Sequence, residues 1–220
     1  MFESLRLVEP GTRKLREEGS IRFLWDPHID RGTPRLIFIV RADSDFQLAI
    51  KKMSESINLA ERIGSPVLSP DLLHQSVAVR YLDTVEMRER LLRAGDVVQA
   101  AAFRIELDRL HSAPNPWGSY NWEVRSRRKS PELVALIAAI NDAVAAQGLP
   151  RGGGHSAHVT LCYSAANTLS DAEPIAPIGW TIDSFELVVG EQGPYGYQYT
   201  TLRRWLLGPE APRAVQMSMF

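Results

Sequence analysis

From residue 35 onward, short runs of β-branched and aromatic residues alternate with longer segments whose apolar residues recur at helical spacing. Residues 35–42 (RLIFIVRA) are largely apolar between Pro34 and Asp43, which indicates a buried strand. Later runs alternate apolar and polar positions, as half-buried strands do. The pattern predicts strands over residues 35–42, 74–82, 102–110, 120–125, 158–163, 181–189 and 198–207.

Three segments place their apolar residues on one helical face. The clearest begins with Ser130 in the N-cap position and closes at Gly148. A second begins at Thr84, and another runs from an N-cap at residue 43 or 44 to Gly64. This mixed order of short strands and amphipathic helices predicts an α+β fold rather than a regular parallel βαβ fold.

The composition is that of a globular protein, with 45% hydrophobic and 23% charged residues in 220. A formal net charge of −1 argues against sequence-blind coating of nucleic acid, which needs a large cationic surplus. The sequence shows no secretory signal, no membrane-length apolar run and a single cysteine, so we expect a cytoplasmic protein. Residues 1–33 are charged and weakly periodic, and we interpret them as an N-terminal extension.

Two strand-like runs begin with the same pattern, histidine, any residue, a hydroxyl residue and an aliphatic residue. They start at His74 (HQSV) and at His158 (HVTL). Because strand side chains alternate, His74 and Ser76 point to one face, with Cα atoms about 6.5–7 Å apart. Likewise, His158 and Thr160 share a face. The alternation predicts Cys162 on that face as well, and residues 159, 161 and 163 on the other.

Two such strands facing each other would direct two imidazoles and two hydroxyls at one point. This arrangement suits a phosphate diester, because one neutral histidine takes a proton from the attacking group and the other, protonated, gives one to the leaving oxygen. The hydroxyls can donate hydrogen bonds to the non-bridging oxygens as charge gathers there. Each proton transfer contributes roughly 10²–10⁴-fold, so this chemistry needs neither a metal nor a cofactor.

The pair HQSV and HVTL resembles the signature of the two-histidine phosphoesterase superfamily, of the 2′-5′ RNA ligase (RNA 2′,3′-cyclic phosphodiesterase) kind. The resemblance extends to RLIFIV, to PELVALIAAINDAVAAQGLP before the second motif, and to FELVVGEQGPYGYQYTTLRRWLL. It covers residues 34–208 and leaves 209–220 as a C-terminal tail.

The resemblance implies two similar lobes, each an antiparallel sheet with helices, around a central cleft that carries both motifs. It implies His74 and His158 as the acid–base pair, and Ser76 and Thr160 as phosphate-binding residues. The substrates implied are RNA ends or cyclic nucleotides with 2′,3′-cyclic phosphates or 2′-5′ linkages, hydrolysed without a metal. No membrane and no obligatory protein partner is indicated.

The sequence departs from this pattern where many relatives have proline before the second histidine and an arginine shortly after the motif. Here Ala157 precedes the histidine, and residues 162–164 are Cys-Tyr-Ser. The phosphate therefore lacks one cationic partner at that position. Arg80, Arg125 and Arg127 are candidates to supply the charge, and each is also an ordinary candidate for a solvated surface.

Two other functions stay open. A protein with the same cleft could bind phosphorylated ligands or RNA ends without turnover, which the absent arginine favours. A metal-dependent hydrolase could instead use Asp26, His28 and Asp30, although Pro27 makes a turn the preferred interpretation. The basic run 125–129 could steer RNA if it borders the cleft. Aromatic residues in connecting segments could stack on bases or close the core: Trp117, Tyr120, Trp122, Tyr195, Tyr197 and Tyr199.

Overall fold

The computed structural model describes residues 33–152, 156–194 and 196–209. The elements, in chain order, are β1 (Arg35–Arg41), α1 (Ser44–Ser56), α2 (Leu59–Ile63), a 3₁₀ turn (Pro70–Leu72), β2 (His74–Ser76), β3 (Tyr81–Leu82), α3 (Val85–Val97), β4 (Phe103–Pro114), β5 (Tyr120–Arg125), α4 (Pro131–Ala146), β6 (His158–Ala165), β7 (Glu173–Ile182), β8 (Ser184–Gly193) and β9 (Gly196–Leu206). The predicted extension up to residue 32, the segment 26–30, His155, Tyr195 and residues 210–220 lie outside the described residues.

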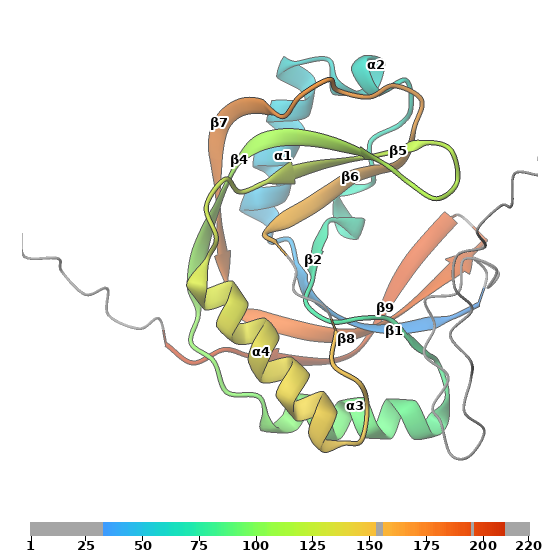
Figure 1. Ribbon diagram of the computed structural model, residues 1–220, viewed down its shortest axis with the longest axis vertical. Helices are drawn as coiled ribbons and strands as arrows, with labels where there is room; N and C mark the ends of the chain where they lie inside the picture. Colours follow the sequence, from blue (N-terminus) through green and yellow to red (C-terminus); the bar gives the residue numbers. More distant parts are fainter. Residues whose placement is uncertain (1–32, 153–155, 195, 210–220) are drawn as a thin grey trace, which may run out of the picture.

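The strands form two antiparallel sheets, which confirms the predicted α+β fold. The first sheet has the order β2-β1-β8-β9, with β3 also paired to β1, and the second has the order β6-β5-β4-β7. Figure 1 shows the two sheets on opposite sides of the centre of the molecule. Each histidine motif begins a strand at the end of a sheet, β2 in the first and β6 in the second.

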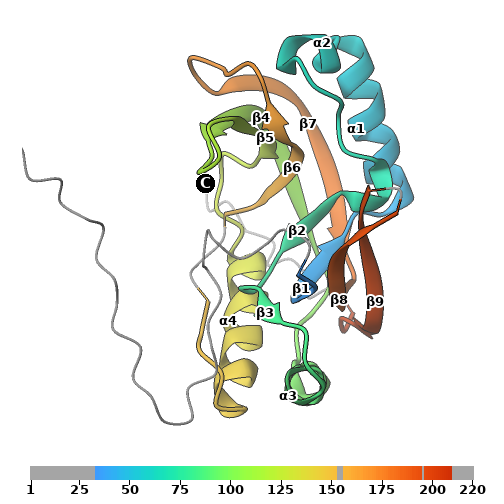
Figure 2. The ribbon, with the colours of Figure 1, turned by 90° about the vertical axis from the view of Figure 1, so that its right-hand side faces the viewer.

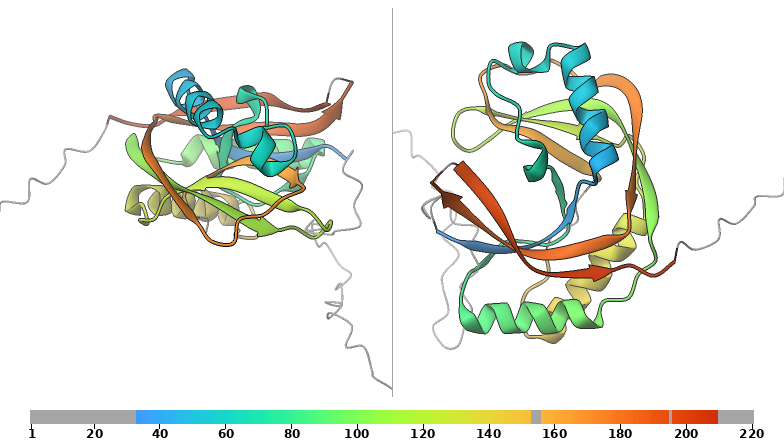
Figure 3. Two further views of the ribbon diagram at one scale, coloured as in Figure 1. Left: turned by 90° about the horizontal axis from the view of Figure 1, so that it is seen from above. Right: turned by 180° about the vertical axis from the view of Figure 1, so that it is seen from behind.

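Each sheet is covered by helices on its outer side. Helix α1 leaves the first sheet after β1 yet packs on β7 of the second, whereas α4 leaves the second sheet after β5 and packs on α3 beneath the first. Figures 2 and 3 show this placement of α1 and α4 from the side and from behind. One large apolar cluster contains buried residues of both lobes, and Ile37, Ile39 and Val188 of the first sheet form a small second cluster. None of the helices in the described ranges has the length and apolarity to cross a bilayer.

Aromatic rings pack where the helices meet the two sheets. Phe46 of α1 stacks on Trp180 of β7, with ring centroids 4.7 Å apart. On the other side, Phe185 of β8 stacks on Trp205 of β9 at 5.1 Å. Helix α3 crosses Trp205 at Gly95, where even a methyl group would overlap the indole ring. The close approach of helix and sheet therefore depends on this glycine.

The N-caps are as predicted: Asp43, Thr84 and Ser130 each accept a hydrogen bond from a backbone amide in the first helical turn. The first helix does not run unbroken to Gly64. It stops at Ser56, and Asn58, at φ 50°, turns the chain into the short α2. Asparagine tolerates this left-handed conformation better than most residues.

Two strand predictions were wrong in their extent. Residues 74–82 form β2 and β3, because the four residues 77–80 face only two residues of β1 and bulge out of the sheet. Residues 181–189 belong to two strands that turn at residue 183, and β7, from residue 173, was not predicted. Strand β7 contains two prolines, which its place at the end of the second sheet accommodates.

Candidate active site

His74 lies on the inner face of the first sheet, on the three-residue strand β2. The ring is 6% exposed and meets the edge of Tyr199, with centroids 4.9 Å apart. Its Nδ1 lies 2.7 Å from the carbonyl oxygen of Leu72. A carbonyl can only accept, so Nδ1 carries a proton, and in the neutral ring Nε2 is the free, basic nitrogen.

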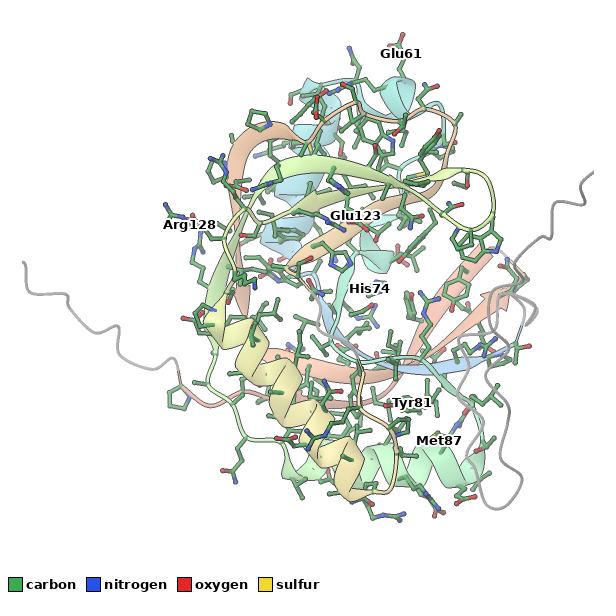
Figure 4. All side chains as sticks on the ribbon, in the orientation of Figure 1. Glu61, His74, Tyr81, Met87, Glu123 and Arg128 are labelled. Carbon is green, nitrogen blue, oxygen red and sulfur yellow. The ribbon has the colours of Figure 1, made fainter. Side chains whose placement is uncertain are left out.

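Burial lowers the pKa of His74 from 6.5 to about 4, against the opposing effect of the hydrogen bond to Leu72. The positive charges of Arg80 and Arg41 and the proximity of His158 lower the pKa further. His74 is therefore a neutral imidazole at neutral pH, and Figure 4 shows it between the two sheets. The fold also brings the two motifs together, because the backbone N–H of His158 donates a hydrogen bond to the side chain of Gln75, the residue after His74.

His158 is anchored in the same manner at the start of β6. Its Nδ1 lies 2.8 Å from the carbonyl oxygen of Ser156, two residues upstream, as Leu72 is upstream of His74. The second ring is thus also protonated on Nδ1 and leaves Nε2 free. It is more open to solvent than His74. The two motifs therefore present equivalent ring nitrogens from two different sheets.

Gln75 joins the two motif strands directly, which sequence reasoning did not anticipate. Its side chain is fully buried between β2 and β6, which pack against each other. Oε1 accepts a hydrogen bond of 2.7 Å from the backbone N–H of His158, and Nε2 donates one of 2.7 Å to the carbonyl of Ser76. The residue between His74 and Ser76 therefore holds the backbone of the other histidine. This role of Gln75 depends on the position of β6, which the sequence around Gln75 does not indicate.

A β-bulge changes the predicted faces of β6. Thr160 pairs with Glu123, but Cys162 already pairs with Trp122, so Leu161 is an extra residue. Cys162 consequently turns into the core beside the buried Trp122, and the prediction that it shares the face of His158 was wrong. The same step brings Tyr163 back to the face of Thr160, with which its hydroxyl forms a hydrogen bond.

The three candidate arginines differ in their surroundings. Arg125, on the face of His158, forms an ion pair of 2.6 Å with Glu123, which Figure 4 labels. Arg127 pairs with Asp108 at 3.4 Å. Arg80 has no ion pair or hydrogen bond within the described chain, and its charge acts on His74 and on tyrosines of both sheets. Arg80 is therefore the candidate that remains available at the site.

The basic run lies apart from the histidines. Arg127, Arg128 and Lys129 line a cavity of about 550 Å³ at the start of α4, and neither motif histidine lines it. Some of the aromatic residues singled out in the sequence lie in the core, and others lie near His74. Trp122 is core, whereas Tyr197 and Tyr199 contact each other edge to face at 5.3 Å, and Tyr199 also meets His74.

Comparison with known proteins was made by sequence and by structure. No protein-family model matches the sequence, and no curated protein matches it. Among the residues described, no group of three or more histidine, cysteine or carboxylate side chains is placed to hold a metal ion.

Several solved structures resemble the fold across most of the chain. The apo form of E. coli LigT aligns with a TM-score of 0.64 and 21% identity, over 80% of this chain and 99% of that chain. TT0787 of Thermus thermophilus aligns at 0.63 and 21% identity, over 80% and 100%. A third structure, described as a phosphoesterase, aligns at 0.62 and 18% identity, over 80% and 99%. LigT has also been crystallised with 3′-AMP, with phosphate and with ATP. This chain therefore shares its fold with these three structures.

Proposed function

We propose that the protein is a phosphoesterase that hydrolyses the 2′,3′-cyclic phosphate, or a 2′-5′ phosphodiester, of RNA or nucleotides by acid–base catalysis with His74 and His158. The observation that carries the proposal is the equivalent anchoring of the two rings. Each donates Nδ1–H to a carbonyl two residues upstream, which leaves both Nε2 atoms for proton transfer. The LigT-like fold and the nucleotide complexes of LigT support the same class of substrate.

The different burial of the two histidines assigns their roles in hydrolysis. His74 is neutral because burial lowers its pKa to about 4, so it is the general base that takes a proton from water. The water oxygen bonds to phosphorus, and the bond from phosphorus to one ribose oxygen breaks. His158, in its protonated form, gives its proton to that leaving oxygen. The product is a 2′- or 3′-phosphate, and ligation is the reverse path through the same groups.

The hydroxyls of Ser76 and Thr160 bind the non-bridging oxygens of the phosphate. Ser76 follows His74 on the same face of β2, opposite Ile39 of β1. Thr160 is 8% exposed and hydrogen-bonded to Tyr163, whose pKa is raised by burial, so the phenol stays neutral. Donors placed in this way stabilise the charge that develops in the transition state.

The test is hydrolysis of the four nucleoside 2′,3′-cyclic monophosphates in EDTA. Wild type is compared with His74→Ala, His158→Ala and the matched control His111→Ala, a histidine of β4 outside both motifs. We expect turnover by wild type and the control, and a loss of at least about 10²-fold in each motif variant.

Retained folding of the variants is verified by circular dichroism. Activity that survives either motif substitution contradicts two-histidine catalysis, and activity abolished by EDTA contradicts a metal-independent reaction. Tight binding of the cyclic nucleotides without product at any pH would instead establish a binding protein.

A further inference from the structure

Two arginines continue the inner face of the first sheet beyond the histidine motif. Along β1, Arg41 lies opposite His74 and Ile39 opposite Ser76. After the bulge, Leu36 pairs with Tyr81, and Ile37 is the next residue of β1 on the inner face. Arg80 ends the bulge directly before Tyr81, and its charge acts on both His74 and Arg35.

Arg35 is the next residue of β1 on this face and pairs with Gly190 of β8. Adjacent positions on one face of a strand are about 6.5–7 Å apart. Arg35 is therefore two such steps along β1 from Ile39, the residue opposite Ser76.

Neither arginine is neutralised by the residues around it. Within the described ranges, Arg35 and Arg80 make no ion pair and no hydrogen bond, and Nη1 of Arg35 is buried without a partner. Burial lowers the pKa of Arg35, and the like charge of Arg80 lowers it further. Glu191, the next residue of β8, bonds Gln198 instead. A buried guanidinium donor without an acceptor is costly, and a bound anion would supply that acceptor.

The surface around the two arginines also has a specific shape. Gly190 has no side chain where Tyr199 crosses β8; a Cβ there would lie 2.8 Å from Cε1 of the Tyr199 ring. Tyr197 contacts the same glycine, and its hydroxyl interacts electrostatically with Arg35. Burial raises the pKa of Tyr197, so its hydroxyl remains a neutral donor. Guanidinium groups and a phenol together offer the donors that a phosphate group accepts.

We propose that Arg35, Arg80 and Tyr197 form a second phosphate subsite, which binds the 5′-phosphate of the nucleotide whose cyclic phosphate reacts at the histidines. The proposal rests on the proposed function and narrows its substrate class to RNA 3′ ends and other nucleotides with a phosphate on the 5′ side. A single ribose separates these two phosphates, and Arg80, whose charge acts on both His74 and Arg35, lies near both sites.

The test measures binding in the His158→Ala background, so that no turnover interferes. The probes are adenosine 2′,3′-cyclic phosphate with and without a 5′-phosphate, titrated by calorimetry. We expect the 5′-phosphate to tighten binding by about 10- to 100-fold, because charge-assisted hydrogen bonds have this strength. The measured ratio is the dissociation constant without the 5′-phosphate divided by the dissociation constant with it. We expect Arg80→Gln and Arg35→Gln each to reduce this ratio towards one. Arg93→Gln, on the exposed side of α3, is the matched control and keeps the ratio.

Each outcome bears on one proposal. A ratio near one in the parent, or a ratio unchanged by Arg80→Gln, overturns the subsite. Because Arg80 is exposed, its substitution keeps the test valid even when Arg35→Gln does not fold. If the ratio holds but wild type hydrolyses neither compound, the proposed function fails and the subsite stands. If wild type hydrolyses both equally well and the ratio is one, the function stands and the subsite fails.

Discussion

At the scale of single residues, the two histidines share their anchoring but not their surroundings. His74 is enclosed by Tyr199 of β9, Arg41 of β1, Arg80 and the second histidine, whereas His158 begins its strand close to solvent. The same motif therefore produces two rings with different exposure to solvent. Repetition in the sequence predicts the pair, and burial distinguishes its members.

The buried His74 makes stability depend on pH. Its pKa is about 4 when folded and 6.5 when unfolded, so between these values the unfolded chain binds a proton that the folded chain does not. The free energy of unfolding should therefore fall by up to about 3 kcal/mol as the pH drops from 6.5 to 4. Urea titrations at several pH values measure this, and His74→Gln should remove this part of the fall. His158→Gln, as the control, should keep it. An identical fall in wild type and His74→Gln would contradict the assignment.

Gln75 offers a second test at the residue scale. Gln75→Met keeps a similar volume but leaves the N–H of His158 and the carbonyl of Ser76 without their partner. Each unsatisfied buried group costs about 1–3 kcal/mol, so we expect chemical denaturation to show a loss of that order. We also expect kcat to fall more than KM rises, since His158 loses its support. The exposed Gln192→Met is the control and should change neither. An unchanged kcat in a less stable Gln75→Met would reduce Gln75 to a structural role.

At the scale of elements, the periodicity and capping residues predict the helices well, because both signals are local. The strands are predicted less completely. The bulge in β6 and the two-residue bulge after β2 arise from pairing with β5 and β1, and nothing local in residues 77–80 or 161–162 marks them. This is why Cys162 and Tyr163 were assigned to the wrong faces.

The contact between Gly95 of α3 and Trp205 of β9 predicts that a glycine-to-alanine substitution in a helix lowers the stability of the protein. Replacing a helical glycine by alanine ordinarily stabilises a protein by up to about 1 kcal/mol. At Gly95 the new methyl group would overlap the ring of Trp205, so we expect Gly95→Ala to destabilise by about 1–3 kcal/mol in thermal or urea unfolding. In the Trp205→Leu background the same substitution should cost much less. Equal costs in both backgrounds would show that the ring is not the cause.

At the scale of the whole molecule, the two lobes are not independent. Helices α1 and α4 each cover the sheet opposite to the one they leave, and one apolar cluster runs through both lobes. Strands β2 and β6 contact each other where the two sheets meet, and the side chain of Gln75 bonds the backbone of His158 there.

We therefore expect both lobes to unfold in one cooperative transition. In urea, far-ultraviolet circular dichroism and tryptophan fluorescence should give the same midpoint. Trp205→Phe removes the indole of β9 in the first sheet and leaves Trp25, Trp117, Trp122 and Trp180, of which the last two lie in strands of the second sheet. The midpoint of the fluorescence should still coincide with that of the circular dichroism. Two separated midpoints would show that the lobes unfold independently.

The sequence by itself determines the mixed α+β pattern, the helix N-caps and the two histidine–hydroxyl pairs, because each depends on residues a few positions apart. The tertiary structure decided what depends on distant chain segments. It set Gln75 against the backbone of His158, turned Cys162 away from the cleft and Tyr163 towards it, and separated Arg80 from Arg125 and Arg127 by giving only the last two a carboxylate partner. Strand pairing and burial are non-local, so the electrostatic character of the site emerges only when the two sheets meet.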